Sequence, residues 1–129
     1  MTLQVIPVKF QKEVESNDDL VDLILESFEM DDDDILVFSQ KIISKNENRI
    51  LRLSSVSPSL LADGIASSYG KDPRLVELIL SESKRIVRME NGVIIVETKH
   101  GFVCANAGID ESNVKDGYAT LLPLSLIHI

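Results

Sequence analysis

The sequence predicts an α+β fold in which a mixed sheet is accompanied by several helices. Short apolar runs with the two-residue spacing of strands are interspersed with segments whose apolar residues recur at helical spacing. These segments follow no regular strand–helix–strand rhythm, which favours α+β over a parallel α/β sheet. The chain has 129 residues and is 44% hydrophobic, so it has the length of one domain and enough apolar residues for a core.

The first third of the chain contains two predicted strands and one predicted helix. Residues 3–8 alternate in the manner of a strand. The polar stretch Asn17–Asp19 offers N-cap oxygens to a helix over about 18–29. The acidic run Asp31–Asp34 lacks the glycine and the closing glutamate of a calcium loop, so it predicts a solvated turn. The continuous apolar run Ile35–Phe38 predicts a strand that is buried on both faces.

Further elements are expected in the middle of the chain. They are a short strand at Ile50–Leu53, a helix from Ser57 to Tyr69, a helix that begins at Asp72-Pro73, a hairpin over Ile86–Val96 and a strand at Gly101–Ala105. Gly70 is well placed to end the first of these helices, because glycine readily adopts a left-handed conformation. The pair Asn91-Gly92 predicts a type I′ turn, in which both central residues have positive φ.

The charge balance and the cysteine content exclude several classes of protein. Lys and Arg number 13 against 21 Asp and Glu, and the net charge of −8 argues against general binding to nucleic acid or to an anionic membrane. The single cysteine, Cys104, excludes an internal disulfide and a cysteine-rich zinc site. No apolar run reaches the ~18 residues of a membrane helix, and no secretory signal is evident. We therefore expect a soluble cytoplasmic protein, in which a local basic patch can still bind one phosphorylated small molecule.

The first candidate site is the polar segment Ser39–Lys45, which follows the predicted buried strand. Two ammonium groups four residues apart, those of Lys41 and Lys45, can be directed at one polyphosphate, with nearby amides and hydroxyls as further donors. A basic surface loop that offsets the acidic chain would explain the same residues. The chain has no G-x-x-x-x-G-K-[ST] loop and no G-x-G-x-x-G motif, so any nucleotide site here is of another kind.

The second candidate site is the small, polar segment Asn106–Asn113. Gly108 permits a close backbone approach, and Asp110 supplies a hard oxygen ligand suited to magnesium or manganese. Ser112 and Asn113 can form hydrogen bonds with phosphate or with metal-bound water. The alternative is an Asx turn with a helix cap, and one carboxylate is too few for a firm metal site.

Several motifs resemble those of the coenzyme F-420:L-glutamate ligases, the gamma-glutamyl ligases of the deazaflavin coenzyme. They are Ser-Gln-Lys-Ile-Ile-Ser-Lys at 39–45, Gly-Lys-Asp-Pro-Arg-Leu-Val-Glu at 70–77, Ile-Leu-Ser-Glu-Ser at 79–83 and the run from His100 to Val114. They occur in the family's order and spacing, from about residue 3 to Pro123. The resemblance therefore rests on several independent segments.

The resemblance implies a GTP-dependent amide ligase with the family's α+β fold. The family transfers the γ-phosphoryl group of GTP to the terminal carboxylate of F-420-0, and the amine of L-glutamate attacks the resulting acyl phosphate. A divalent cation, Mn2+ or Mg2+, is implied because phosphate charge must be neutralised during transfer, and K+ is a further expected ion. The implied partners are GTP, L-glutamate, F-420-0 and a second copy in a homodimer, with no nucleic acid and no membrane.

Carried over position by position, the resemblance assigns a nucleotide site and a metal ligand but no catalytic residue. Asp110 is the implied ligand of the divalent ion. The implied GTP contacts are Gln11, Lys12, Glu13, Val14, Gln40, Lys41, Lys45 and Asn113, with Lys41 and Lys45 at the phosphates. The loop Gln11–Val14 departs from the family's usual Gly-x-Pro pattern, so contacts there are expected through its backbone.

The end of the chain departs from the family. Members continue beyond this length, and their second half carries further acidic and Thr/Ser metal ligands. We expect residues 1–123 to be the N-terminal part of a truncated ligase domain and residues 124–129 to be a non-native tail. Such a fragment should be inactive alone. The alternatives are a non-catalytic nucleotide-binding module and an inert fragment.

Overall fold

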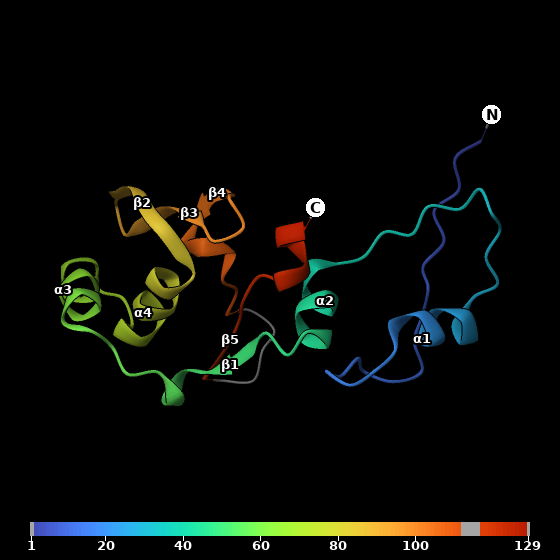
Figure 1. The fold of residues 1–129 in the computed structure, drawn as a ribbon, viewed down its shortest axis with the longest axis horizontal. Helices are drawn as coiled ribbons and strands as arrows, with labels where there is room; N and C mark the ends of the chain where they lie inside the picture. Colours follow the sequence, from blue (N-terminus) through green and yellow to red (C-terminus); the bar gives the residue numbers. More distant parts are fainter. Residues whose placement is uncertain (1, 112–116, 129) are drawn as a thin grey trace.

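The computed structural model describes residues 2–111 and 117–128. The helices are α1 (Leu20–Ser27), α2 (Gln40–Asn46), α3 (Leu60–Tyr69) and α4 (Pro73–Ser81); the strands are β1 (Ile50–Arg52), β2 (Ser83–Glu90), β3 (Val93–Thr98), β4 (Val103–Ala105) and β5 (Tyr118–Thr120). Short 3-10 turns are η1 (Leu53–Ser55), η2 (Asn106–Gly108) and η3 (Leu124–His128). These elements confirm the predicted α+β class, with two antiparallel sheets in the orders β1-β5 and β2-β3-β4. Figure 1 shows the larger sheet with α3 and α4 at one end of an elongated molecule and α1 at the other.

The main hydrophobic core lies between α3, α4 and the three-stranded sheet. Strands β2 and β3 form the predicted hairpin, and β4 pairs with the other edge of β3. Apolar side chains from both helices, β3 and η2 form one buried cluster: Ala62, Ile65, Ala66, Leu75, Val76, Ile79, Ile94, Val96 and Ala107. Burial of each larger side chain in such a cluster contributes roughly 1.5–3 kcal/mol to the free energy of unfolding. This cluster is therefore the main source of stability at this end of the molecule.

The boundaries of these elements follow local signals in the sequence. Ser59 caps α3 with its side chain, Gly70 ends that helix in the left-handed conformation with φ of 64°, and Asp72 caps α4. Asn91 and Gly92 have φ values of 49° and 77°, as a type I′ turn requires. The predicted helices and the predicted turn are confirmed, except that α3 begins at Leu60 rather than at Ser57 because Ser59 is its N-cap.

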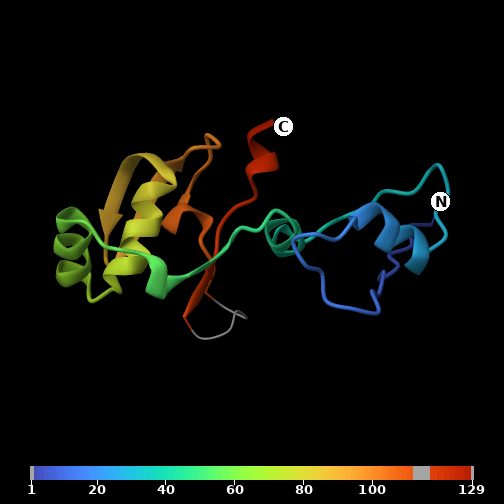
Figure 2. The same cartoon turned by 60° about the horizontal axis from the view of Figure 1, so that its bottom comes forward.

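A second, smaller sheet joins the core to helix α2. Strand β1 pairs with β5, and Asp110 pairs with Thr120 through an isolated bridge. Leu53, Leu78 and Ala119 form a second buried cluster that connects this sheet to α4. Helix α2 lies about midway along the molecule, as the view in Figure 2 shows.

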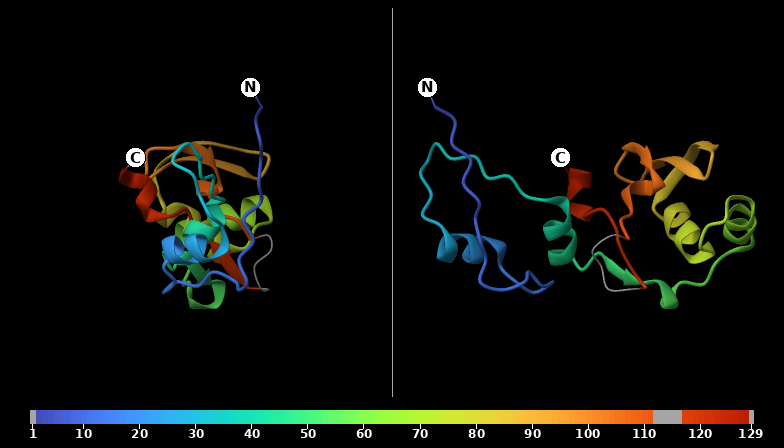
Figure 3. Two further views of the ribbon diagram at one scale, coloured as in Figure 1. Left: turned by 90° about the vertical axis from the view of Figure 1, so that its right-hand side faces the viewer. Right: turned by 180° about the vertical axis from the view of Figure 1, so that it is seen from behind.

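The N-terminal part differs most from the prediction. Helix α1 is confirmed, and the acidic run Asp31–Asp34 is a solvated turn as expected. However, residues 3–8 and Ile35–Phe38 form no strand, and most of their apolar side chains are exposed. A strand needs a partner to satisfy its backbone groups, and the described residues provide none for either segment. The right-hand view of Figure 3 places α1 and the segments around it far from α3 and α4.

The helices are short compared with a bilayer. The longest in the described ranges is α3, with 10 residues, and no helix there has the length and hydrophobicity needed to cross a membrane.

Candidate functional site

Helix α2 carries the first candidate site. The sequence predicts that Lys41 and Lys45 follow the end of a buried strand, but they lie in a seven-residue helix whose N-cap is Ser39. The prediction of a strand end was wrong because the preceding run, Ile35–Phe38, forms no strand. A separation of four residues is about one helical turn, so both ammonium groups still lie on one face of α2.

Helix α2 is attached to the small sheet through Ser44. This side chain is fully buried, and its hydroxyl donates a 2.7 Å hydrogen bond to the carbonyl of Leu121, directly after β5. The Gln40 amide donates to the Ser44 hydroxyl oxygen at 2.6 Å and lies 3.4 Å from the same carbonyl. Gln40, an expected nucleotide contact, is therefore hydrogen-bonded within the protein on the side of α2 that faces β5.

The loop before α1 packs against α2 through Asn46. The Asn46 amide donates to the carbonyls of Asp18 at 2.7 Å and Glu15 at 3.4 Å. The Asp18 carboxylate accepts hydrogen bonds from the Glu15 backbone N–H at 2.8 Å and from the Lys12 ammonium at 2.5 Å. The bond from Lys12 holds the pKa of the Asp18 carboxyl below its ordinary value, and the same bond raises the pKa of Lys12. The Lys12–Asp18 pair joins two parts of the loop, and the Asn46 amide attaches the loop to α2.

A pocket of about 260 Å³ lies between this loop and α2. Its lining residues are Phe10, Lys12, Glu13, Val14, Ser39, Lys41, Ile42 and Lys45. Three of the four expected loop contacts and both expected phosphate-binding lysines therefore lie in one place, whereas Gln11 and Gln40 do not line the pocket. Lys45 also forms an ion pair with Glu13, which links the helix to the loop.

The second candidate site meets the first at Lys41. The Lys41 ammonium lies 2.8 Å from the Asp110 carboxylate. Asp110 follows the turn Asn106–Gly108, whose three residues have positive φ values of 51°, 55° and 69°. The turn reverses the chain so that Asp110 can pair with Thr120 beside α2. The expected metal ligand and an expected phosphate-binding lysine are thus neighbours, although they are far apart in the sequence.

The described residues do not make a divalent-cation site by themselves. Asp110 offers a hard oxygen, but its carboxylate faces an ammonium group, and no set of three or more acidic, histidine or cysteine side chains in the described residues could hold a metal ion. Asn113, the remaining expected contact, lies outside the described residues.

The sequence profile of one family, described as F420-0:Gamma-glutamyl ligase, matches residues 10–126. That range contains the loop, helix α2 and Asp110. The chain belongs to this family.

Named members of the family are similar to the chain over nearly all of its length. The coenzyme F420:L-glutamate ligase of Methanopyrus kandleri is 44% identical over 122 residues, which cover 95% of this chain and 48% of the relative. The ligase of Methanothermobacter thermautotrophicus is 47% identical over 128 residues, which cover 95% of this chain and 51% of the relative. The ligase of Archaeoglobus fulgidus is 40% identical over 124 residues, which cover 96% of this chain and 49% of the relative. The chain spans about half the length of these curated relatives.

Two residues of this candidate site are not indicated by the sequence. The sequence indicates Asp18 only as part of a helix-capping stretch and does not single out Asn46, yet together they attach the loop to α2. Lys12 and Asp18 are six residues apart, a separation that brings two side chains into contact in neither a helix nor an extended strand. In the sequence, the loop Gln11–Val14 is indicated as part of a site by the family resemblance alone.

Proposed function

We propose that the pocket between the loop and α2 binds the phosphate groups of GTP, and that the chain contributes this site to a ligase that joins L-glutamate to F420-0. The observation that carries the proposal is the position of Lys12, Lys41 and Lys45 around one pocket in a chain of net charge −8. Ammonium groups form strong, charge-assisted hydrogen bonds with phosphate oxygens. The similarity to relatives named coenzyme F420:L-glutamate ligase supports this reaction.

The proposed reaction needs a phosphate donor because a carboxylate is a poor electrophile. Transfer of the γ-phosphoryl group from GTP to the F420-0 carboxylate would give an acyl phosphate and GDP. The amine of L-glutamate would then attack the acyl carbon, the bond from that carbon to the phosphate oxygen would break, and an amide and inorganic phosphate would form. Lys41 and Lys45 would hold the phosphates and offset the charge that develops on them during transfer.

The carboxylates beside the lysines orient them before the nucleotide arrives. Lys41 pairs with Asp110, and Lys45 pairs with Glu13. Bound phosphate would share or replace these contacts. Because the long side chains are already directed at the pocket region, less conformational entropy is lost on binding. A divalent cation, K+ and a homodimer remain predictions from the resemblance.

Calorimetric titration of GTP into the purified chain tests the phosphate site. We expect weak binding that falls at least tenfold in Lys45→Ala and in Lys41→Ala, because each removes one charge from the pocket. Lys84→Ala removes an exposed lysine on β2 and is the matched control, so its affinity should equal that of the wild type. GTP affinity that is unchanged in Lys45→Ala would contradict the proposal.

A turnover assay with GTP, L-glutamate and F420-0 separates the ligase from the alternatives. We expect no glutamylated product from this chain alone, because it spans about half of its relatives. Product formation by the purified chain would refute that expectation. The same assay is repeated with this chain combined with the half of a relative that it does not span. GTP binding without turnover in that preparation would favour a non-catalytic nucleotide-binding module.

A further inference from the structure

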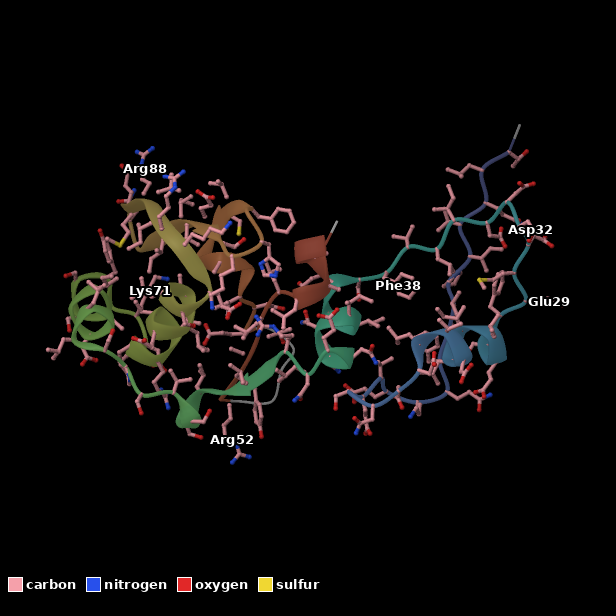
Figure 4. The ribbon with its side chains drawn as sticks, in the orientation of Figure 1. Glu29, Asp32, Phe38, Arg52, Lys71 and Arg88 are labelled. Carbon is pink, nitrogen blue, oxygen red and sulfur yellow. The ribbon has the colours of Figure 1, made fainter. Side chains whose placement is uncertain are left out.

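The segment Ile35–Phe38 presents apolar side chains on both faces of an extended backbone. Ile35 and Val37 are 88% and 90% exposed, whereas Leu36 and Phe38 are 42% and 41% exposed. Successive side chains of an extended backbone point to opposite sides, so the more exposed face is wholly apolar. A strand with one face in water carries polar side chains on that face. Figure 4 shows Phe38 on the stretch that leads from the N-terminal part to α2, away from the main core.

Residues 3–8 repeat this pattern. Leu3 and Val5 are 90% and 86% exposed, whereas Ile6 is 50% exposed and Val8 is half-buried. Within the described part of the chain, no backbone–backbone hydrogen bond joins either segment to another element. Single exposed apolar residues are common, but contiguous runs of them mark a surface that another element covers.

We propose that the apolar surface formed by residues 3–8 and 35–38 is the docking surface for the half of the family polypeptide that lies outside this chain. Because the chain spans about half the length of its curated relatives, full-length members have about as many residues again to cover it. Strands of that half would satisfy the unpaired backbone groups, and its side chains would bury the outward apolar face. Phe38 directly precedes Ser39, the N-cap of α2, so docking would also fix the start of the helix that carries Lys41.

Co-expression tests this proposal. The complete chain, with an affinity tag, is co-expressed with the half of the Methanothermobacter thermautotrophicus relative that the alignment leaves uncovered. We expect the two to co-purify, and we expect the amides of residues 3–8 and 35–38 to exchange with deuterium at least 100-fold more slowly than in the chain alone. The double variant Ile35→Asp/Val37→Asp should lower recovery of the complex at least tenfold. Leu60→Asp, at a 91% exposed leucine on α3, is the matched control and should leave recovery unchanged.

A second measurement does not depend on reassembly from two pieces. In the intact Methanothermobacter thermautotrophicus relative, the segments that align with residues 3–8 and 35–38 should be as protected from exchange as its core strands. Rapid exchange there, or co-purification that is insensitive to Ile35→Asp/Val37→Asp, would overturn the proposal. Protection that appears in this chain alone with a dimer mass would assign the surface to a second copy, and protection only with phosphatidylcholine vesicles would assign it to lipid. Either result would overturn the proposal as well.

Discussion

Asp72 is both the N-cap of α4 and the ion-pair partner of Arg74. Its carboxylate accepts hydrogen bonds from the Arg74 guanidinium at 3.0 and 2.6 Å and from the Arg74 backbone N–H at 2.9 Å. These bonds, chiefly those from the guanidinium, hold the pKa of the Asp72 carboxyl below its ordinary value. The folded state therefore favours the ionised form. The resulting stabilisation is present above about pH 4 and is lost as the pH falls through the lowered pKa.

We expect Asp72→Asn to lose less folding free energy than the wild type between pH 6 and pH 3, because asparagine keeps an oxygen for the cap but carries no charge to titrate. Asp72→Ala removes the cap as well and should cost about 1 kcal/mol at pH 6. Urea unfolding at the two pH values measures both effects. If Asp72→Asn lost as much stability on acidification as the wild type, the paired carboxylate would not be the source of that pH dependence.

Gly108 occupies a position that only glycine fits without strain. Its φ is +69°, and a Cβ there would lie 2.9 Å from three side-chain atoms of Leu122. We expect Gly108→Ala to lower the free energy of unfolding by roughly 2 kcal/mol or more, from the left-handed backbone and the overpacking together. Gly64→Ala, in α3 with nothing within 4 Å of the added Cβ, should instead stabilise by roughly 0.5–1 kcal/mol. Urea denaturation of both variants checks the contrast, and equal effects would contradict it.

Among the elements, α2 is joined to the small sheet by the buried hydroxyl of Ser44. Ser44→Ala would remove the donor to the Leu121 carbonyl and should cost about 1–3 kcal/mol. Because the same helix carries Lys41 and Lys45, we also expect the GTP affinity to fall, although Ser44 does not line the pocket. Ser68→Ala is the control: it removes a hydroxyl that bonds an exposed carbonyl within α3 and should change neither quantity measurably. A stability loss without any loss of GTP affinity would show that α2 is positioned by other contacts.

The elements differ in how well the sequence predicts them, and the difference has a physical origin. The caps Ser59 and Gly70 and the turn Asn91-Gly92 act within a few residues, so α3 and the hairpin were predicted correctly. An apolar run such as Ile35–Phe38 indicates burial but not the surface that buries it, and the prediction of a strand was wrong for the described chain. The contact of Lys41 with Asp110 depends on the small sheet and the turn before it, which no local spacing indicates.

At the scale of the whole molecule, buried side chains are distributed unevenly. The cluster between α3, α4 and the larger sheet joins two helices to β3 and η2. In residues 2–38, by contrast, only Val14 and Ile24 are buried. Few buried contacts mean a small free energy of local opening, so the N-terminal part should open without unfolding of the core.

Hydrogen exchange across the chain tests this uneven stability. We expect the amides of α4 and β3 to be at least 100-fold more protected than those of α1, because the former exchange only when the core unfolds. Ile79→Ala, which opens a cavity in the core cluster, should cost about 2–5 kcal/mol and should reduce protection in α4 and β3 while leaving α1 unchanged. Ile24→Ala is the matched substitution in α1, and it should reduce protection in α1 while leaving α4 and β3 unchanged. If either substitution reduced protection equally at both ends, the molecule would unfold as one cooperative unit, and the pocket between the loop and α2 would then be as stable as the core itself.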